Sequence, residues 1–389
     1  MKSTLVSVTG LPIFASNVLR QEEKIEEKGG KKRKFIYRTM GKTRIKLPVI
    51  SMGGEMATAP ALFRAALDSG INHLETNHII IRGKNEEMIG ESVKGRPRDS
   101  YFITTQIGFT QNMITGGLLP QANEGDFLKR LDISLKRLGL DYVDFLCFHN
   151  ARSRQSVLDE KVLNVMGKAK KDGKVRFAGA SCHRNEPEVI QACTDSKFYD
   201  FVMTSYNFRQ KHYLEVREAI ARAAQAGLGI IAFKVMGGTA DLLRPVNASA
   251  ALKWVLQDPN VHTITPGISS FDHLNIDLAV MEDLSLTDSE KDYLQREASL
   301  PGLYCQGCGQ CVKQCVAKFP IPDLMRAYMY TYGYRKPAMA QELVVSLGLP
   351  LHVCEDCGQC PVKCSIGFDV PGKIRDVARL RDVPPEFLA

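Results

Sequence analysis

The sequence predicts an α/β protein in which a (β/α)8 barrel over residues 35–297 is followed by a smaller, cysteine-rich domain over residues 298–389. Two observations support this prediction. Strand-like runs alternate with helical patterns eight times over the ~250 residues that such a barrel needs. The second domain holds eight of the 11 cysteines of the chain, in two runs with identical spacing. Residues 1–34 precede the barrel as an N-terminal arm and linker.

The arm carries the first signals in chain order. Residues 1–22 contain a mildly apolar stretch that resembles the core of an export signal, but no twin arginine precedes it. As written, the chain is expected in the cytoplasm. The alternatives are a clipped twin-arginine signal, which would export the folded protein, and a frayed terminus. Residues 23–34, rich in Glu, Lys and Gly, are expected to form a linker.

Positive charge is concentrated next to this linker. The net charge is +8, and the segment from Lys28 to Lys46 holds nine basic residues and no acidic one. No aromatic residue is interleaved before Phe35, so we interpret the segment as a solvated linker and expect no nucleic-acid partner. No run of 18 apolar residues occurs, and no membrane-spanning helix is predicted.

The barrel region begins with an expected hairpin, in which Phe35–Arg38 and Arg44–Val49 flank Gly41. Amphipathic helical patterns such as Asp126–Leu138, with apolar residues on one face and Lys and Arg opposite, separate the strand-like runs that follow. The eight barrel strands are expected at Ile50–Gly53, Asn72–Thr76, Tyr101–Ile107, Val143–His149, Phe177–His183, Phe201–Asn207, Gly229–Val235 and His262–Gly267.

The two cysteine runs have the spacing of bacterial two-cluster ferredoxins, in which the fourth cysteine of each run ligates the other cluster. We therefore predict two [4Fe–4S] clusters. Their expected ligands are Cys305, Cys308, Cys311 and Cys364 for one cluster, and Cys354, Cys357, Cys360 and Cys315 for the other. Zinc favours two separated C-x-x-C pairs, and disulfides favour small secreted scaffolds, so both alternatives match the spacing less well. The proline that usually follows the fourth cysteine is absent, since Val316 and Ser365 stand there.

Segments along the whole barrel region resemble the aldo/keto reductase family, in family order. They are Arg38–Lys42, Ala66–Asn72, Gly83–Gly90, Ser134–Gly139, Asp141–Asp144, Gly173–Gly179, Tyr206–Asn207 and Pro266–Gly267. The resemblance implies a TIM barrel and an oxidoreductase that acts on a small-molecule substrate. The C-terminal addition is similar to the subfamily with a ferredoxin-type domain. Helical-looking stretches at Ile321–Tyr330 and Met339–Leu347 imply a mainly α-helical ferredoxin-like iron–sulfur domain.

The family resemblance also implies where catalytic groups would lie. The family uses Asp, Tyr, Lys and His at the mouths of strands two to four, and these positions read Glu75, Ile80, Gln106 and His149 here. An isoleucine cannot donate a proton and a glutamine carries no charge, so acid catalysis worth ~10²–10⁴ in rate would be largely lost. The catalytic candidates are therefore His149, Glu75 and His78, the last from the same loop as Ile80.

Fewer positions of the sequence match those with which the family binds a nicotinamide cofactor. Ser181 stands where the family holds the carboxamide, and the loop after the last strand offers backbone N–H groups to a pyrophosphate at a helix start. The loop residues are Pro266, Gly267, Ser269 and Ser270. The loop has no Arg or Lys for a 2′-phosphate, which favours NAD over NADP. NAD(P) binding is left open beside the two clusters.

Three functions remain open. The first is an iron–sulfur oxidoreductase of the aldo/keto reductase type, which couples a barrel substrate site to electron transfer and needs a redox partner protein. The second is a catalytically degenerate barrel that acts as a binding or electron-carrier protein. The third is a metal-dependent enzyme at the barrel mouth, with Glu75, His78, His149 and His183 as ligands. Whether the chain is an enzyme, and its oligomeric state, are left without a prediction.

Overall fold

Eight parallel strands form a barrel in the computed structural model, which describes residues 21–26, 32–112, 115–237, 246–300, 304–350, 352–354, 357 and 359–388. The strands are β4 (Met52–Gly53), β5 (His73–Glu75), β6 (Phe102–Gly108), β7 (Val143–His149), β8 (Val175–Cys182), β9 (Phe201–Ser205), β10 (Gly229–Phe233) and β11 (Thr263–Ile264). Each pairs with its neighbour in chain order. Parallel bridges Ile50↔Ile264 and Gly53↔Gly267 join the first strand region to the last. The predicted barrel is confirmed.

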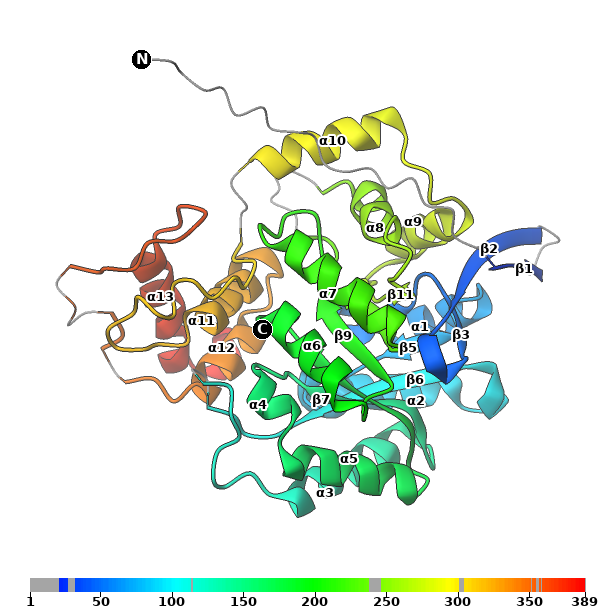
Figure 1. Cartoon of the computed structure of the whole chain (residues 1–389), viewed down its shortest axis with the longest axis horizontal. Coiled ribbons are helices and arrows are strands. Elements are labelled where there is room, and N and C mark those ends of the chain that lie inside the picture. The colour runs from blue at the N-terminus through cyan, green and yellow to red at the C-terminus, as the bar shows by residue number, and fades with distance from the viewer. Residues whose placement is uncertain are drawn as a thin grey trace.

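Helices alternate with these strands and cover the barrel from outside (Figure 1). Helix α3 shows why they form: Asn123 caps its first turn, Phe127 and Leu131 bury its apolar face, and Gly139 ends it at a φ of 66°. The covering helices are α1 (Pro60–Asp68), α2 (Lys84–Val93), α3 (Glu124–Leu138), α4 (Arg154–Val157), α5 (Glu160–Lys171), α6 (Glu186–Ser196), α7 (Tyr213–Gln225), α8 (Ala248–Leu256), α9 (Phe271–Glu282) and α10 (Asp288–Ser299).

The predicted hairpin closes the amino-terminal end of the barrel. Strands β2 (Lys32–Thr39) and β3 (Lys46–Pro48) pair antiparallel, as expected. Met40 and Leu47 from this hairpin are fully buried in the same cluster as the side chains inside the barrel, among them Phe145. The hairpin therefore seals one end, and the carboxyl ends of the strands form the opposite, open end.

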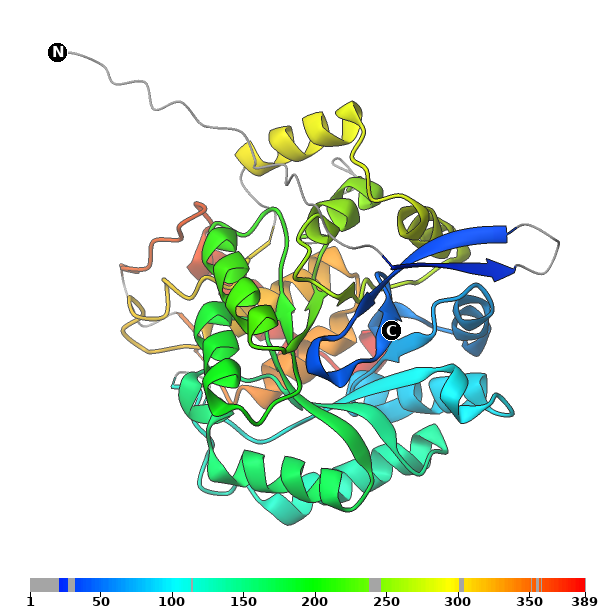
Figure 2. The ribbon, with the colours of Figure 1, turned by 45° about the vertical axis from the view of Figure 1, so that its right-hand side comes forward.

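The linker prediction for residues 23–34 is wrong at 23–26 and 32–34, which belong to strands, and residues 27–31 lie outside the described residues. Strand β1 (Gln21–Glu26) pairs antiparallel with β2 and extends the hairpin away from the barrel (Figure 2). The pairing sets a mostly acidic strand opposite a basic one, a pattern that favours cross-strand pairing and that composition alone does not reveal. Residues 1–20, on which the export-signal expectation rests, lie outside the described residues.

The C-terminal domain is helical and has its own hydrophobic core. Its elements are α11 (Ile321–Tyr328), the π-helix η5 (Met329–Gly333), α12 (Pro337–Ser346), α13 (Val370–Ala378) and the short turns η6 (Arg379–Asp382) and η7 (Pro385–Phe387). Leu324, Val344 and Ile374 from three of these helices share one buried cluster. The two helical stretches expected between the cysteine runs are confirmed, whereas α13 was not predicted.

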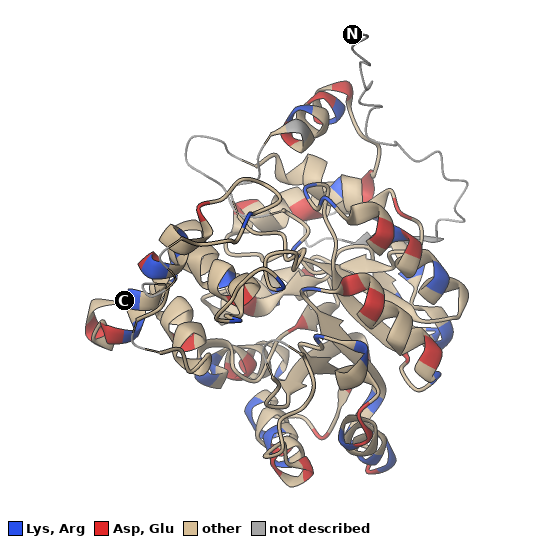
Figure 3. Ribbon diagram, turned by 60° about the vertical axis from the view of Figure 1, so that its left-hand side comes forward, with Lys and Arg blue, Asp and Glu red and all other residues tan. Residues whose placement is uncertain are grey.

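Charged residues of both signs are spread over the outer helices, and the central strands carry few (Figure 3). Within the described part of the chain, no helix combines the length and the hydrophobicity that crossing a bilayer requires.

Candidate functional site

Four residues named from the sequence meet at the open end of the barrel. Glu75 ends β5, Gln106 lies near the end of β6, His149 ends β7 and His183 follows β8. Side chains alternate along a strand, so residues an even number apart share a face. Phe145, four residues before His149, belongs to the cluster inside the barrel, and these side chains therefore face inward. The rings of His149 and His183 have centroids 6.1 Å apart.

Glu75 is a buried acid held in place by Gln106. The Gln106 Nε2 donates a hydrogen bond to Glu75 Oε1 at 2.5 Å. Burial raises the pKa of Glu75 to about 8, the hydrogen bond from Gln106 opposes this shift, and the nearby Glu55 carboxylate adds to it. Glu75 therefore carries a proton at neutral pH and can donate it. The glutamine at the family's lysine position thus orients the acid without supplying charge.

The loop after β5 offers no equivalent of the family's tyrosine. Ile80 begins the 3-10 turn η3 (Ile80–Gly83), in which Ile81 and Arg82 adopt left-handed backbone angles. His78 directs its Nδ1 to the backbone oxygen of Gln106 at 3.0 Å. Burial lowers the pKa of His78 to about 4, so the imidazole is neutral at neutral pH.

The two inner histidines are neutral as well. Burial lowers the pKa of His149 to about 3, and the neighbouring charges of Arg326, Arg152 and Lys234 act in the same direction. The pKa of His183 is lowered by burial and by the same cations. Among the residues that the structure describes, no group of three or more His, Cys, Asp or Glu side chains could hold a metal ion. The metal site expected as an alternative at the barrel mouth is therefore not formed.

Sequence reasoning missed an ion pair at this mouth. Lys234, directly after β10, places its Nζ 2.9 Å from Glu55 Oε2, in the turn η2 (Gly54–Met56) after β4. Burial acts to lower the pKa of Lys234, but the Glu55 carboxylate outweighs it and holds the pKa above its usual value. Glu55 follows the expected strand Ile50–Gly53 and Lys234 falls near the end of the expected strand Gly229–Val235, but no pattern in the sequence pairs the two.

The residues expected to hold a nicotinamide lie along two strand ends. Ser181 is fully buried on β8. Pro266 accepts a hydrogen bond from the Gly53 N–H at 2.9 Å, so this loop also closes the barrel, and Gly267 lies against the Met56 side chain. Ser270 caps α9 by accepting from the His273 N–H, and Ser269 Oγ lies 3.2 Å from His273 Nδ1. A dinucleotide at this loop stays a prediction.

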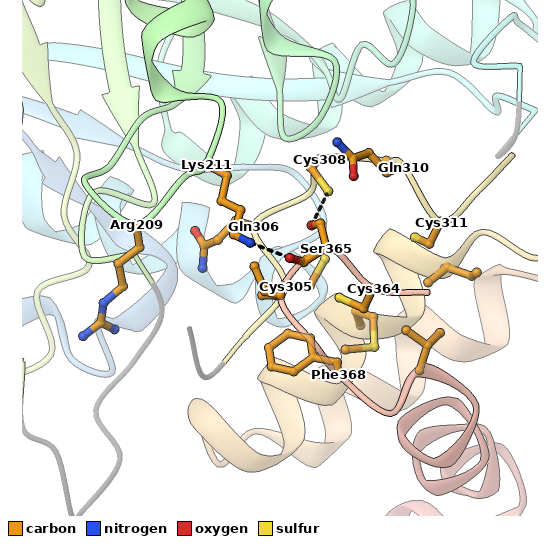
Figure 4. Close-up of a pocket in the computed structure, with 15 residues that line it drawn as sticks. Arg209, Lys211, Cys305, Gln306, Cys308, Gln310, Cys311, Cys364, Ser365 and Phe368 are labelled. Atoms are coloured by element: carbon orange, nitrogen blue, oxygen red, sulfur yellow. Dashed lines mark hydrogen bonds between the residues drawn. The ribbon is translucent and has the colours of Figure 1, made fainter. Parts of the chain in front are cut away.

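The first cysteine set lines a cavity in the C-terminal domain (Figure 4). The cavity occupies about 530 Å³, including the solvent at its mouth, and Met325 and Phe368 supply apolar walls. Ser365 Oγ lies 3.5 Å from Cys308 Sγ, and the Lys211 ammonium donates to the Ser365 carbonyl. The thiols that line the cavity are Cys305, Cys308, Cys311 and Cys364.

The second set lines a separate cavity of about 380 Å³, including the solvent at its mouth. Its thiols are Cys315, Cys354, Cys357 and Cys360, and Ile374 and Val362 are among the apolar residues around them. Each cavity thus draws three cysteines from one run and one from the other. This is the grouping that the ferredoxin spacing predicts.

The described cysteines do not form a group that could hold a single metal ion either, and the cavities would suit a cluster instead. All eight cysteines are free thiols, so no disulfide competes. A single ion needs its ligands around one point, whereas a cubane of iron and sulfide spreads its four thiolates over a larger surface. The Gly307 N–H donates to Cys305 Sγ at 3.3 Å and the Phe319 N–H to Cys315 Sγ at 3.4 Å. Such donors stabilise thiolate ligands.

The first cavity touches the barrel mouth through the backbone. Gly307, in the loop between Cys305 and Cys308, has a φ of +75°, and a Cβ there would lie 2.7 Å from the His183 carbonyl oxygen. Only glycine allows this approach. The side chain of the same His183 faces His149 at the mouth. One residue therefore joins the two sites.

Glu75 gives a first test of the mouth. Between pH 4.5, its ordinary pKa, and about 8, the unfolded chain ionises this carboxyl while the folded chain keeps it protonated. The folded state thus binds more protons, and stability falls as the pH rises through this window. Glutamine mimics the protonated acid, so Glu75→Gln should match the wild type near pH 4.5 and exceed it increasingly towards pH 8, by up to about 1.4 kcal/mol per pH unit.

Thermal unfolding of both proteins between pH 4.5 and 8.5 measures this difference. Glu91→Gln is the matched control, because Glu91 is a largely exposed residue of α2 paired only with Arg64 at the surface. Identical pH dependence of Glu75→Gln and the wild type would show that Glu75 is ionised in the fold.

Comparisons with known proteins agree with the barrel geometry. Residues 52–243 match the model of the aldo/keto reductase family. L-glyceraldehyde 3-phosphate reductase of Escherichia coli is 24% identical over 315 residues, covering 65% of this chain and 90% of that protein. An aldo-keto reductase of a Mycobacterium species is 28% identical over 262 residues, covering 63% of this chain and 84% of its own.

Solved structures show the same fold. The holo form of an aldo-keto reductase from Bacillus halodurans superposes with a TM-score of 0.53 at 21% identity, covering 67% of this chain and 95% of that one. The strand order, the match of residues 52–243 to the aldo/keto reductase family and the similarity to these relatives agree on one barrel fold.

Proposed function

We propose that the chain is an iron–sulfur oxidoreductase of the aldo/keto reductase type, in which a substrate site at the barrel mouth is coupled to electron transfer through two [4Fe–4S] clusters. The observation that carries this proposal is the sorting of eight free thiols into two cavities, each with three cysteines from one run and one from the other. When bound, such clusters supply one-electron exchange with a partner.

The chain's own residues prepare both cavities. The ligand sets are Cys305, Cys308, Cys311 and Cys364, and Cys315, Cys354, Cys357 and Cys360. Apolar side chains form part of each cavity wall, and backbone N–H donors at Gly307 and Phe319 offset thiolate charge. Cys360 is exposed and Val316, next to Cys315, is 77% exposed, so the second set offers the surface on which a redox partner protein would dock.

At the barrel mouth the protein supplies a proton. Oxidation of an alcohol releases two electrons and two protons, and reduction of a carbonyl takes them up. Protonated Glu75, oriented by Gln106, can give one of these protons when a carbonyl is reduced, and its ionised form can receive one when an alcohol is oxidised. Neutral His149 lies at the same mouth. The substrate is a small carbonyl or hydroxyl compound. The name of the E. coli relative describes action on a small phosphorylated aldehyde. A nicotinamide would lie at Ser181 and the loop of Pro266, Gly267, Ser269 and Ser270.

A second function is favoured by two specific positions. Ile80 and Gln106 replace the tyrosine and lysine that the family resemblance implies. A barrel without this chemistry would act as a binding or electron-carrier protein. It would still bind ligands at the mouth but would not turn them over.

Anaerobic purification tests the first function. We expect about eight irons and eight sulfides per chain, since each [4Fe–4S] cluster holds four of each. The reduced protein should give the EPR signals of such clusters. Two irons or fewer would contradict the two-cluster proposal.

Titration with NADH and NADPH, followed by their fluorescence, separates the remaining functions. Saturable binding without turnover over a panel of carbonyl compounds would favour the binding protein.

A further inference from the structure

We propose that the barrel mouth binds a small organic anion, a carboxylate or phosphate ester, between Lys234 of the barrel and Arg326 of the C-terminal domain. Neither residue stands at a position for which the family resemblance implies a role. The inference names the substrate class of the proposed enzyme and rests on that function for the reaction, although the binding itself needs no redox chemistry.

The backbone conformation of Lys234 directs its side chain toward the barrel mouth. Strand β10 ends at Phe233, whose side chain faces the barrel interior, so regular alternation would turn Lys234 away from it. Lys234 instead has a φ of 54°, a left-handed conformation that a non-glycine residue adopts at a cost. Its ammonium pairs with Glu55, lies 5.8 Å and 5.3 Å from the ring centroids of Tyr330 and Tyr334, and keeps 20% of its side chain exposed.

Arg326 brings a second cation from α11 with little to neutralise it. Within the described part of the chain its one ion pair, to Asp323 Oδ1, is 3.9 Å long and beyond hydrogen-bond range. The other oxygen of Asp323 already accepts from Arg152 at 2.7 Å and lies 3.4 Å from Arg184. One carboxylate therefore interacts with three guanidinium groups. The Arg326 side chain is largely buried, at 14% exposed, and has five N–H donors beside this distant acceptor, which favours a further anion.

The two cations act on the same space. The charges of Lys234 and Arg326 both lower the pKa of His149 and of His183, after the larger effect of burial. Both also lower the pKa of Glu55, where burial acts in the opposite direction. Geometry agrees with this: Arg326 lies three residues after Asp323, which bonds to Arg152 beyond β7, and about one helical turn before Tyr330, whose ring lies 5.8 Å from the Lys234 ammonium.

An inventory of donors and acceptors identifies the ligand class. At neutral pH the mouth presents the Lys234 ammonium, the Arg326 guanidinium, the protonated Glu75 and two neutral imidazoles. Two carboxylates oppose them: Glu55, which pairs with Lys234, and Asp323, which three guanidinium groups share. Donors and positive charge are in excess. A ligand that supplies negatively charged oxygens balances both, and a carboxylate or phosphate ester has the geometry that an arginine recognises.

The π-helix supports a functional role for this contact. Segment η5 (Met329–Gly333) carries Tyr330, and Lys336 just beyond it donates to the Glu55 carbonyl at 3.2 Å. Short π-helical turns are frequent at functional sites, because they displace side chains from the regular helical path. The C-terminal domain thus completes the mouth, and the site exists only when both domains are present.

Calorimetry on the full, anaerobically purified chain tests the inference. The probes are lactate and pyruvate for carboxylates, glycerol 3-phosphate for phosphate esters, and 1,2-propanediol and hydroxyacetone as uncharged analogues. We expect at least one charged class to bind, and Arg326→Gln to weaken it about tenfold or more, as loss of a charge-assisted pair of about 1.4 kcal/mol or more would do. Arg326→Lys should retain part of the affinity.

Arg64→Gln is the matched control, since Arg64 forms a surface pair with Glu91 on the outer helices. It should bind like the wild type. Equal binding of charged and uncharged probes, or unchanged affinity in Arg326→Gln, would overturn the inference. Binding of NADH but of none of the small anions would also overturn the inference. Iron content is measured on the same samples, so anion binding without iron would refute the cluster proposal and leave this inference intact.

Discussion

A chain in which both Cys305 and Cys364 are replaced by alanine is expected to keep about half of its iron, whereas a chain without Cys305 and Cys354 should lose nearly all of it. The reason is the sorting of thiols in the two cavities. Cys305 and Cys364 line the same cavity although they belong to different runs, and Cys354 lines the other. The first double variant therefore removes two ligands of one proposed cluster, and the second removes one ligand of each.

Iron and sulfide analysis after anaerobic purification measures the outcome, and EPR of the reduced protein shows whether one kind of signal survives. Alanine is used because a serine oxygen could still ligate iron. Cys193→Ala is the control: this thiol is buried in α6 of the barrel and should leave the iron content unchanged. If the Cys305/Cys364 variant lost nearly all iron, each cluster would be held within one run and the crossed arrangement would be wrong.

The barrel was predictable because its signal repeats. Buried parallel strands read as apolar runs, and amphipathic helices separate them at regular intervals. The eight expected strands each overlap an observed one, with ends that differ by a few residues, as for Phe177–His183 against β8 (Val175–Cys182). Helix α13 was missed because it follows the second cysteine run directly. In that region the loop-like residues of the cysteine run mask the short amphipathic pattern of the helix.

The error at residues 23–34 has a different origin. Composition rich in Glu, Lys and Gly is typical of a linker. Strand β1 forms because β2 offers it a partner, with Gln21 opposite Tyr37 and Glu26 opposite Lys32. Strand pairing of this kind depends on a second segment, which a reading of one segment by its composition cannot include.

The site shows the same division between local and distant signals. The cysteine cavities follow from spacing within each run, so the sequence grouped the thiols as the structure does. Glu75 and His149 were found because they end predicted strands. The partnership of Lys234 with Glu55 and with the C-terminal Tyr330 joins residues far apart in the chain, and the left-handed turn at Lys234 has no sequence signature. These contacts could be identified only from the folded structure.

The contact between the two domains gives the second large expected effect. Asp323 of α11 is buried against Arg152 and Arg184, whose side chains are only 8% and 5% exposed and which follow β7 and β8 of the barrel. Asp323→Ala removes this carboxylate from the buried guanidinium groups. We expect a loss of about 3–5 kcal/mol in the free energy of unfolding, the usual cost of removing one partner of a buried ion pair.

Denaturant unfolding of wild type, Asp323→Ala and Asp323→Asn measures this loss. Asp172→Ala is the matched control, because its pair with Lys168 lies at the surface and should contribute less than about 1 kcal/mol. A loss in Asp323→Ala as small as in the control would show that Asp323 does not join the domains.

Acid supplies an independent check on Asp323. Burial acts to raise its pKa, but the charges of Arg152, Arg326 and Arg184 outweigh it, so the pKa lies below its ordinary 3.8. A carboxyl with a lowered pKa stabilises the fold at pH values above 3.8 and loses this contribution as the pH falls through its folded pKa. The stability gap between wild type and Asp323→Ala should therefore be full at neutral pH and shrink under strong acid. Acetate, which can take the place of the missing carboxylate beside the three arginines, should restore part of the stability of the alanine variant at neutral pH, whereas acetamide, of the same size and without charge, should not.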